Sequence, residues 1–344
     1  MLFTGIGWLA ATGGVPWGST FAPDAMPLLS LALAALALCG ALAMLLGHGV
    51  EPGAPGSQPP GGAVGNAAAR DATAPDLAGF RAFLATRDGE PNPLRHTLSV
   101  REQFFARLEQ DPVRSRLAVD RERFLENLAR YTPEPGLGPQ MLWLLATAKA
   151  NQAERFGVGL AELYGKIPFH DGDPIRVHIA LQETYHTRIL ADAVAMFGLP
   201  VDARPPQLAA RLIVNLILTL PERWSLPVTG FAEIAGCVLF RALRDRGVEL
   251  FAAEPEVAER IRALYDEILA DELSHVGYVA AQLGSIGRRV MLALHRAIGW
   301  RMVARMPEVA RLFPKHELQA RFAAFDLGSM VAEFAGRTYT VATI

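Results

Sequence analysis

Apolar residues recur along this chain at the spacing that places them on one face of an α-helix, in segments bounded by helix start and stop signals. No long stretch alternates apolar with polar residues as a half-buried strand does. The pattern predicts two leading helices, over residues 99–111 and 112–131. It then predicts two helical hairpins, one formed by residues 138–166 with 175–197 and the other by residues 228–246 with 256–283. Two later helices are expected over residues 288–304 and 316–334. The expected fold is therefore all-α.

Local signals set several of these expected boundaries. Ser99 followed by Glu102 forms a capping box, in which each residue satisfies a free backbone N–H group of the first turn. Pro112 fits the first turn of the next helix, where its missing N–H group costs nothing. Gly198 and Pro200 are expected to end the helix over residues 175–197.

The N-terminal part of the chain has a different pattern. Residues 1–50 are apolar, and residues 27–47 carry no charge and are long enough to span a bilayer as a transmembrane helix. Residues 51–76 are rich in Gly, Pro and Ala, which predicts a flexible linker. We expect a membrane anchor followed by a helical domain over residues 77–344; the alternative is an extension from a misplaced start codon.

Charge and cysteine content exclude several kinds of partner and site. The chain has 33 Lys and Arg against 35 Asp and Glu, a formal net charge of -2, so nothing favours nucleic acid as a partner. Its two cysteines, Cys39 and Cys237, lie far apart, which argues against a disulfide framework and against a cysteine-based zinc or iron–sulfur site. A reducing compartment fits best, so the domain is expected in the cytoplasm.

Two Glu-x-x-His motifs are the most informative residues. Glu183 with His186, and Glu272 with His275, each lie inside a predicted helix, where a spacing of three places both side chains on one face. Each of these faces is otherwise apolar. Buried carboxylates are costly unless they are paired or bind a metal ion, so these faces indicate a metal site.

The partner helix of each hairpin offers a further carboxylate. Glu154 lies at a height similar to that of Glu183 once the first hairpin is closed, and Glu233 stands near the level of Glu272 in the second. Together the four carboxylates and two imidazoles could neutralise and bind two divalent ions. The alternative is that Glu154 and Glu233 are ordinary surface residues.

The order Glu, Glu-x-x-His, Glu, Glu-x-x-His resembles the ferritin-like superfamily of di-iron carboxylate proteins. The resemblance covers the chain from Glu154 to His275 and implies a ferritin-like four-helix bundle with additional flanking helices. It implies two iron ions, or manganese, one bound by Glu154, Glu183 and His186 and the other by Glu233, Glu272 and His275. Glu183 and Glu272 would bridge the two metals.

The same resemblance assigns roles behind the ligands. Asp271, directly before the second motif, looks like the carboxylate that accepts a hydrogen bond from a ligating histidine and fixes its ring. Gln182 holds the corresponding place before the first motif. Cys237, one turn after Glu233, occupies a place that borders the oxygen-binding side in many oxygenases of the superfamily, which makes it a candidate catalytic thiol; a small buried core residue is the alternative.

The function that the resemblance implies is an O2-activating oxygenase or oxidase. Its substrate would be a small organic molecule that is hydroxylated, N-oxygenated or desaturated, with an external electron donor as partner. The chain looks most like the aminobenzoate N-oxygenase and soluble acyl desaturase types. The former has an extra histidine one turn before its last motif, where this chain has Ile268.

Two other functions stay open at this point. One is a membrane-associated quinol oxidase or quinone hydroxylase, which has the same ligand pattern and a lipid substrate that would account for residues 27–47. The other is a helical bundle that binds metal structurally and catalyses no reaction.

Overall fold

A computed structural model of the protein describes residues 93–163, 174–201, 211, 214–215, 219–335 and 337–338. The chain divides between residues 53 and 54, and every described residue belongs to the second part. The expected transmembrane helix at residues 27–47 and the expected linker at residues 51–76 lie outside the described residues.

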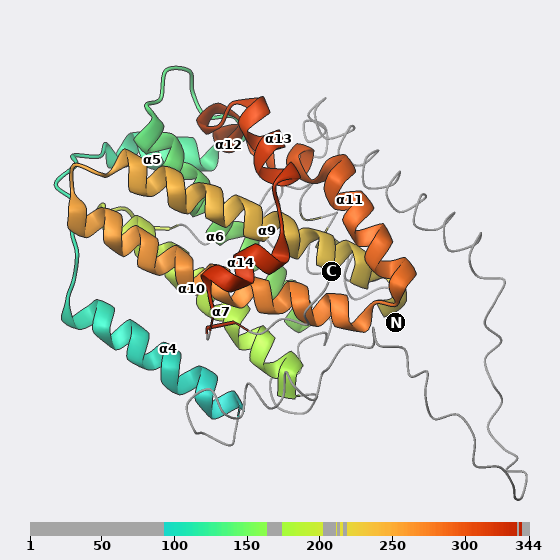
Figure 1. Ribbon diagram of the computed structural model, residues 1–344. Helices are drawn as coiled ribbons and strands as arrows, with labels where there is room; N and C mark the ends of the chain where they lie inside the picture. The colour runs from blue at the N-terminus through green and yellow to red at the C-terminus, as the bar shows by residue number, and fades with distance from the viewer. Residues whose placement is uncertain are drawn as a thin grey trace, which may run out of the picture. The chain divides into compact units, whose positions relative to one another are not determined.

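All regular elements in this described part are α-helices (Figure 1), as the sequence pattern predicts. They are α4 (Pro93–Gln110), α5 (Arg121–Ala129), α6 (Pro139–Leu163), α7 (Pro174–Ala195), α9 (Glu222–Leu250), α10 (Pro255–Gln282), α11 (Ser285–Val303), α12 (Pro307–Leu312), α13 (Lys315–Ala323) and α14 (Leu327–Glu333).

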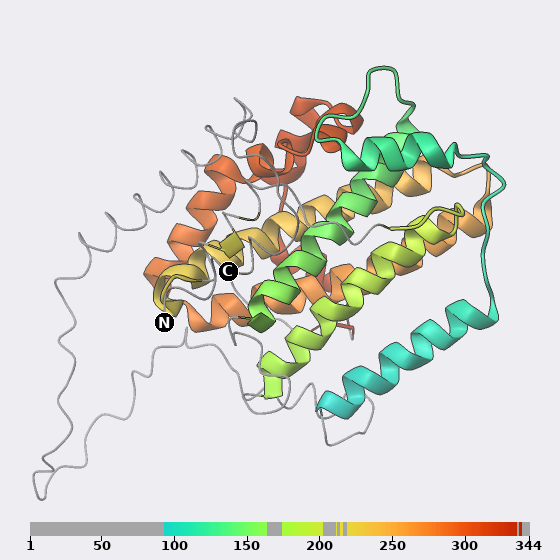
Figure 2. The same ribbon diagram turned by 180° about the vertical axis from the view of Figure 1, so that it is seen from behind.

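The four long helices α6, α7, α9 and α10 pack in a ring, which we call the four-helix core. Helix α6 contacts α7, α7 contacts α10, α10 contacts α9, and α9 closes the ring against α6. Figures 1 and 2 show these helices running side by side. Large side chains such as Trp143, Ile189, Ile234 and Tyr265 are fully buried, and removing their apolar area from water stabilises the packing.

The shorter helices cover this core from outside. Helix α4 packs on α7, α5 and α12 pack on α6, α11 packs on α9, and α14 packs on α10. Helix α13 contacts both α9 and α11. The two hairpins expected from the sequence, α6 with α7 and α9 with α10, are thus both present and form the core.

The two leading helices differ from the expectation. Helix α4 begins at Pro93, so Ser99 lies within it and does not cap its start. Residues 112–120 are irregular instead of helical, because their polar groups bond elsewhere: the Ser115 N–H donates to Met196 O at 2.9 Å and the Arg116 N–H to Glu254 at 2.6 Å. Helix α5 starts only at Arg121, and the carboxylate of Asp120 caps it by accepting from the Arg123 N–H at 3.0 Å.

Two later boundaries also differ. Helix α9 begins at Glu222, before the expected start at residue 228, and includes Pro227 near its N-terminal end, where proline removes a single backbone hydrogen bond. The helix expected over residues 316–334 is divided into α13 and α14. The Asp326 carboxylate accepts from the Ser329 N–H at 2.8 Å and so caps a new helix at that point.

One described stretch, Ser225–Leu250 within α9, is long and apolar enough to cross a membrane by length and composition, with a hydropathy of 1.5. Its most apolar window is 56% buried inside the protein, and a core helix passes the same test. Helix α9 contacts α6, α10, α11 and α13, so packing within the domain accounts for its apolar character.

Candidate metal centre

Six side chains from the four core helices converge on one place. Their possible ligand atoms form two clusters, each within 4.8 Å, and both clusters include Glu183. The first cluster is Glu154, Glu183 and His186, and the second is Glu183, Glu233, Glu272 and His275. These are the six residues predicted from the sequence. Glu154 and Glu233 therefore face the two motifs instead of lying apart on the surface.

The two histidines turn their Nδ1 atoms toward the carboxylates. His275 Nδ1 lies 2.9 Å from Glu183 Oε1 and 3.7 Å from Glu233 Oε2. His186 Nδ1 lies 3.6 Å from Glu183 Oε2 and 3.4 Å from Glu272 Oε1. The ring centroids are 5.8 Å apart. The two oxygens of Glu183 thus face different histidines.

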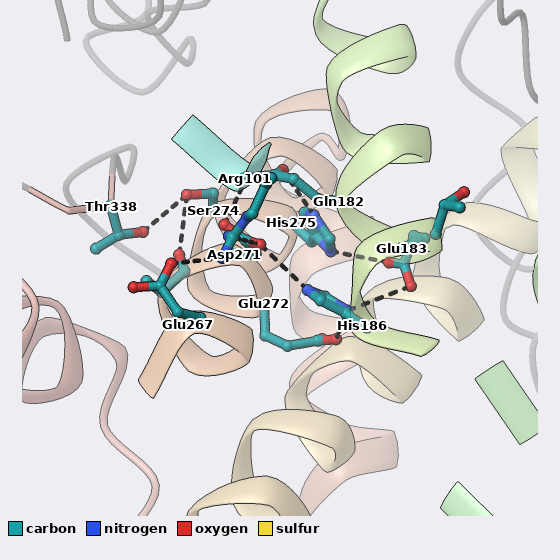
Figure 3. Close-up of polar contacts among 12 residues, drawn as sticks. Arg101, Gln182, Glu183, His186, Glu267, Asp271, Glu272, Ser274, His275 and Thr338 are labelled. Carbon is teal, nitrogen blue, oxygen red and sulfur yellow. Dashed lines mark hydrogen bonds and ion pairs between the residues drawn. The ribbon is translucent and has the colours of Figure 1, made fainter. Parts of the chain in front are cut away.

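The Nε2 atoms point the other way and are held by hydrogen bonds (Figure 3). His186 Nε2–H donates to Asp271 Oδ2 at 3.3 Å, and His275 Nε2–H donates to Gln182 Oε1 at 3.1 Å. The amide of Gln182 is oriented by its own donation from Nε2 to Asp271 Oδ1 at 2.6 Å. The residue before each Glu-x-x-His motif therefore holds the histidine of the other motif.

These hydrogen bonds decide where the free lone pairs of the imidazoles lie. A carboxylate and an amide oxygen can only accept, so both Nε2 atoms carry the hydrogen, and a neutral imidazole then has its lone pair on Nδ1. Neither Nδ1 atom has a hydrogen-bond partner among the described residues, although both are buried. In that neutral form, the two Nδ1 lone pairs that face carboxylates fit the ligand set of a metal pair.

The carboxylates and imidazoles perturb one another strongly. Burial, with repulsion from Glu183 and Glu272, raises the pKa of Glu154 well above its usual range. Burial, with repulsion from Glu272, also raises the pKa of Glu233, to about 8. For Glu183, burial opposes the charge, but His186 and His275 outweigh it and lower its pKa well below its usual range.

The histidines and Asp271 shift in the directions expected of ion-pair partners. Burial alone would lower the pKa of each histidine, because it disfavours the charged imidazole. For His186, the interactions with Asp271 and Glu183 are stronger than this effect and raise its pKa well above normal. For His275, the interactions with Glu183 and Glu233 do the same. For Asp271, burial is outweighed by the charge of Arg101 and the hydrogen bond from His186, which lower its pKa. Protons thus balance the negative charge where a metal would otherwise do so.

Arg101 is a residue of this site that sequence reasoning misses. It lies on α4, is only 3% exposed, and pairs with both Asp271 and Glu267 of α10. The sequence carries no spacing that connects it with the motifs, because its partners lie 166 and 170 residues further along the chain.

The site is buried on its histidine side and more open on its glutamate side. The side chains of His186 and Asp271 are 0% and 1% exposed, whereas those of Glu183 and Glu233 are 21% and 19% exposed. Small molecules can therefore reach the carboxylates more readily than the imidazoles.

Cys237 and Gly236 lie near Glu272, and Ile268 lies one turn before it on α10. Cys237 is fully buried, and burial, with the charges of Glu272 and Glu233, raises the pKa of its thiol well above normal, which keeps it uncharged. A Cβ atom on Gly236 would lie 3.2 Å from Glu272 Oε2, so the glycine leaves room for that carboxylate. Ile268, at the place of the extra histidine of the N-oxygenase type, is fully buried.

Comparison of the chain with family models, with curated proteins and with solved structures finds no match. Buried glutamates and histidines that could hold metal ions are the functional feature that the molecule itself presents.

Proposed function

We propose that the protein is a ferritin-like four-helix bundle that holds a pair of iron ions and uses O2 to oxidise a small organic substrate. One observation carries the proposal: the buried Nδ1 atoms of His186 and His275 have no hydrogen-bond partner among the described residues and face carboxylates from all four core helices. Such a donor set, two imidazoles and four carboxylates, is the one that di-iron and di-manganese bundles use.

Charge balance supports two divalent ions. The four glutamates Glu154, Glu183, Glu233 and Glu272 would carry four negative charges when ionised, which equals the charge of two divalent cations. Asp271 does not enter this sum because Arg101 already pairs with it. Oxygen and imidazole ligands suit iron and manganese better than the soft ions that prefer thiolates.

The orientation of Glu183 supports a shared ligand. One of its oxygens lies near His186 and the other near His275, so a single carboxylate reaches both metal positions. Glu272 approaches His186 while it also belongs to the cluster of His275. We therefore assign Glu183 and Glu272 as the bridging carboxylates, with Glu154 and Glu233 each serving one metal.

The residues around the centre divide the work of an oxidase. Glu154, Glu183, His186, Glu233, Glu272 and His275 would hold a pair of ferrous ions, whose chemistry would be the reduction of O2 with electrons renewed by an external donor. Asp271 and Gln182 hold the imidazoles in the ligating orientation. Through the more exposed side chains of Glu183 and Glu233, O2 and substrate would reach the centre.

An anaerobic titration tests the proposal. The full chain is loaded with ferrous ions without O2, its iron content is measured, and O2 consumption is followed after mixing. We expect about two irons per chain and rapid uptake of O2. The Glu183→Ala, Glu272→Ala double variant should lose both, whereas a Glu249→Ala, Glu259→Ala variant, altered at exposed glutamates of α9 and α10, should retain both.

The same experiment separates catalysis from a structural metal site. Stoichiometric metal with no reaction toward O2 would favour a non-catalytic bundle. A wild-type chain that binds no metal pair would contradict the centre itself.

A further inference from the structure

Helix α4 lies outside the four-helix core, but its Arg101 side chain reaches the hydrogen-bond network beside the candidate metal ligands. It packs on α7, and Arg101 extends from it to Glu267 and Asp271 of α10. A buried guanidinium is costly unless its donors are paired, and both terminal nitrogens of Arg101 have a carboxylate partner. Arg101 therefore joins α4 to α10 at the histidine side of the site.

Asp271 receives three donors at once. Arg101 Nη2 and His186 Nε2 both donate to Oδ2, and Gln182 Nε2 donates to Oδ1 (Figure 3). An ionised carboxylate can accept from all three donors, because it carries no hydrogen of its own. Among these donors, Arg101 is the one whose positive charge is permanent.

The two histidines are held by different means. His275 Nε2 donates to a neutral amide, that of Gln182, which is itself oriented by its hydrogen bond to Asp271. His186 Nε2 donates to a carboxylate, that of Asp271, whose Oδ2 atom also accepts from Arg101. If Arg101 is removed, Asp271 loses the donor that fixes this oxygen beside His186.

We infer that Arg101 is a positioning residue for metal binding, which acts on His186 through Asp271. This inference rests on the proposed metal centre. Arg101 contacts neither cluster of candidate ligands directly, so its effect reaches a metal only through the direction in which the His186 ring presents Nδ1. Partners that orient a ligating histidine in this manner contribute roughly 10- to 100-fold to metal affinity.

Zinc is a suitable probe because it has no redox chemistry and accepts imidazole and carboxylate ligands. Zinc binding to the full chain is measured by calorimetry for the wild type, Arg101→Met and Arg337→Met. Arg337 is a matched control, because it donates to Glu267 at 2.6 Å and is not among the residues paired with Asp271.

We expect two zinc equivalents in the wild type and in Arg337→Met. In Arg101→Met, one equivalent should bind roughly 10- to 100-fold more weakly while the other keeps its affinity. Spectra of the zinc-loaded proteins with 15N-labelled histidine should show one of the two zinc-bound imidazoles shifted, because a general loss of stability would disturb both or neither.

Arg101→Lys keeps the test decisive if the methionine variant does not fold. Lysine retains the charge but lacks the planar pair of donors that reaches both carboxylates, so we expect a smaller loss at the same equivalent. The inference would be overturned, with the metal centre intact, if both Arg101 variants bound both zinc equivalents with wild-type affinity. It would also be overturned if Arg101→Met and Arg337→Met weakened zinc binding equally. A wild-type chain without two zinc equivalents would overturn the centre.

Discussion

At the scale of single residues, the site depends on the direction in which each imidazole is turned. The Nε2 atoms of His186 and His275 are held by Asp271 and Gln182, so both Nδ1 atoms point toward the carboxylates. The spacing of the two motifs on apolar helix faces was enough to predict the convergence of these residues. Arg101 was not predictable, because only the folded arrangement of α4 against the core brings it to Asp271.

Glu233 and Glu249 offer a direct comparison on one helix. We expect Glu233→Ala to weaken one metal equivalent by more than the roughly 10- to 100-fold cost of losing an outer partner, because a ligand itself is removed. Glu249→Ala, at a side chain 67% exposed, should leave metal binding unchanged. Equilibrium dialysis with zinc measures both, and equal affinities in the two variants would remove Glu233 from the site.

Metal binding should release protons, because the metal-free site holds them. Without metal, the pKa of Glu233, raised to about 8, keeps this group largely protonated at pH 7, and the raised pKa values of His186, His275 and Glu154 favour their protonated forms. A metal ion replaces the protons, so its affinity should rise as the pH approaches about 8 and fall on acidification. Calorimetry in buffers of different ionisation enthalpy counts the protons, and a count of zero at pH 7 would contradict this account.

At the scale of the helices, α6 and α9, which carry Glu154 and Glu233, approach each other closely at Trp143. Trp143 Nε1 donates to Leu243 O at 2.7 Å, and a Cβ on Gly247 would lie only 2.8 Å from the Trp143 ring. The glycine therefore permits the two helices to approach at this point.

Gly247→Ala should destabilise the fold by roughly 1–3 kcal/mol, because the added methyl group overpacks this contact. Gly159→Ala is the matched control on α6, where nothing lies within 4 Å of the added Cβ, and it should be neutral or stabilising by up to about 1 kcal/mol. Urea unfolding of both variants measures the difference, and a Gly247→Ala variant as stable as Gly159→Ala would show that the contact is not limiting.

Most of the error in the predicted elements arose where local signals met tertiary partners. Ser99 and Glu102 have the residues of a capping box, yet α4 continues through them from Pro93. Pro112 was expected to open a helix, yet the segment after it bonds to Met196 and Glu254 instead. Long helices with a continuous apolar face were predictable, because their packing does not depend on one boundary residue.

At the scale of the whole described domain, the candidate centre connects all four core helices. Each metal ion that binds only the folded state adds to the stability, by about 2.7 kcal/mol per site at a free metal concentration 100 times its Kd. We expect zinc to raise the Tm of the wild type and to leave the Glu183→Ala, Glu272→Ala variant unchanged. Scanning calorimetry with and without a chelator measures this, and identical zinc-induced shifts in both proteins would place the stabilising metal elsewhere.

The ring of four helices was predictable as two hairpins, but their covering was only partly so. The later helices α11, α13 and α14 pack around α9 and α10, and the order of these contacts follows from three-dimensional fit and not from any pattern along the chain. The expected membrane anchor at residues 27–47 stays a prediction, which fractionation of cells expressing the full chain tests directly.

The most direct measurement is anomalous X-ray diffraction at the iron edge, from crystals of the full chain loaded with ferrous ions without O2. We expect two iron peaks within the six-residue site, each about 2 Å from the Nδ1 atom of His186 or His275, as for other divalent metals bound by imidazole. Glu183 would lie between the two peaks. Absence of both peaks, or iron bound outside these residues, would contradict the assignment of a two-metal centre.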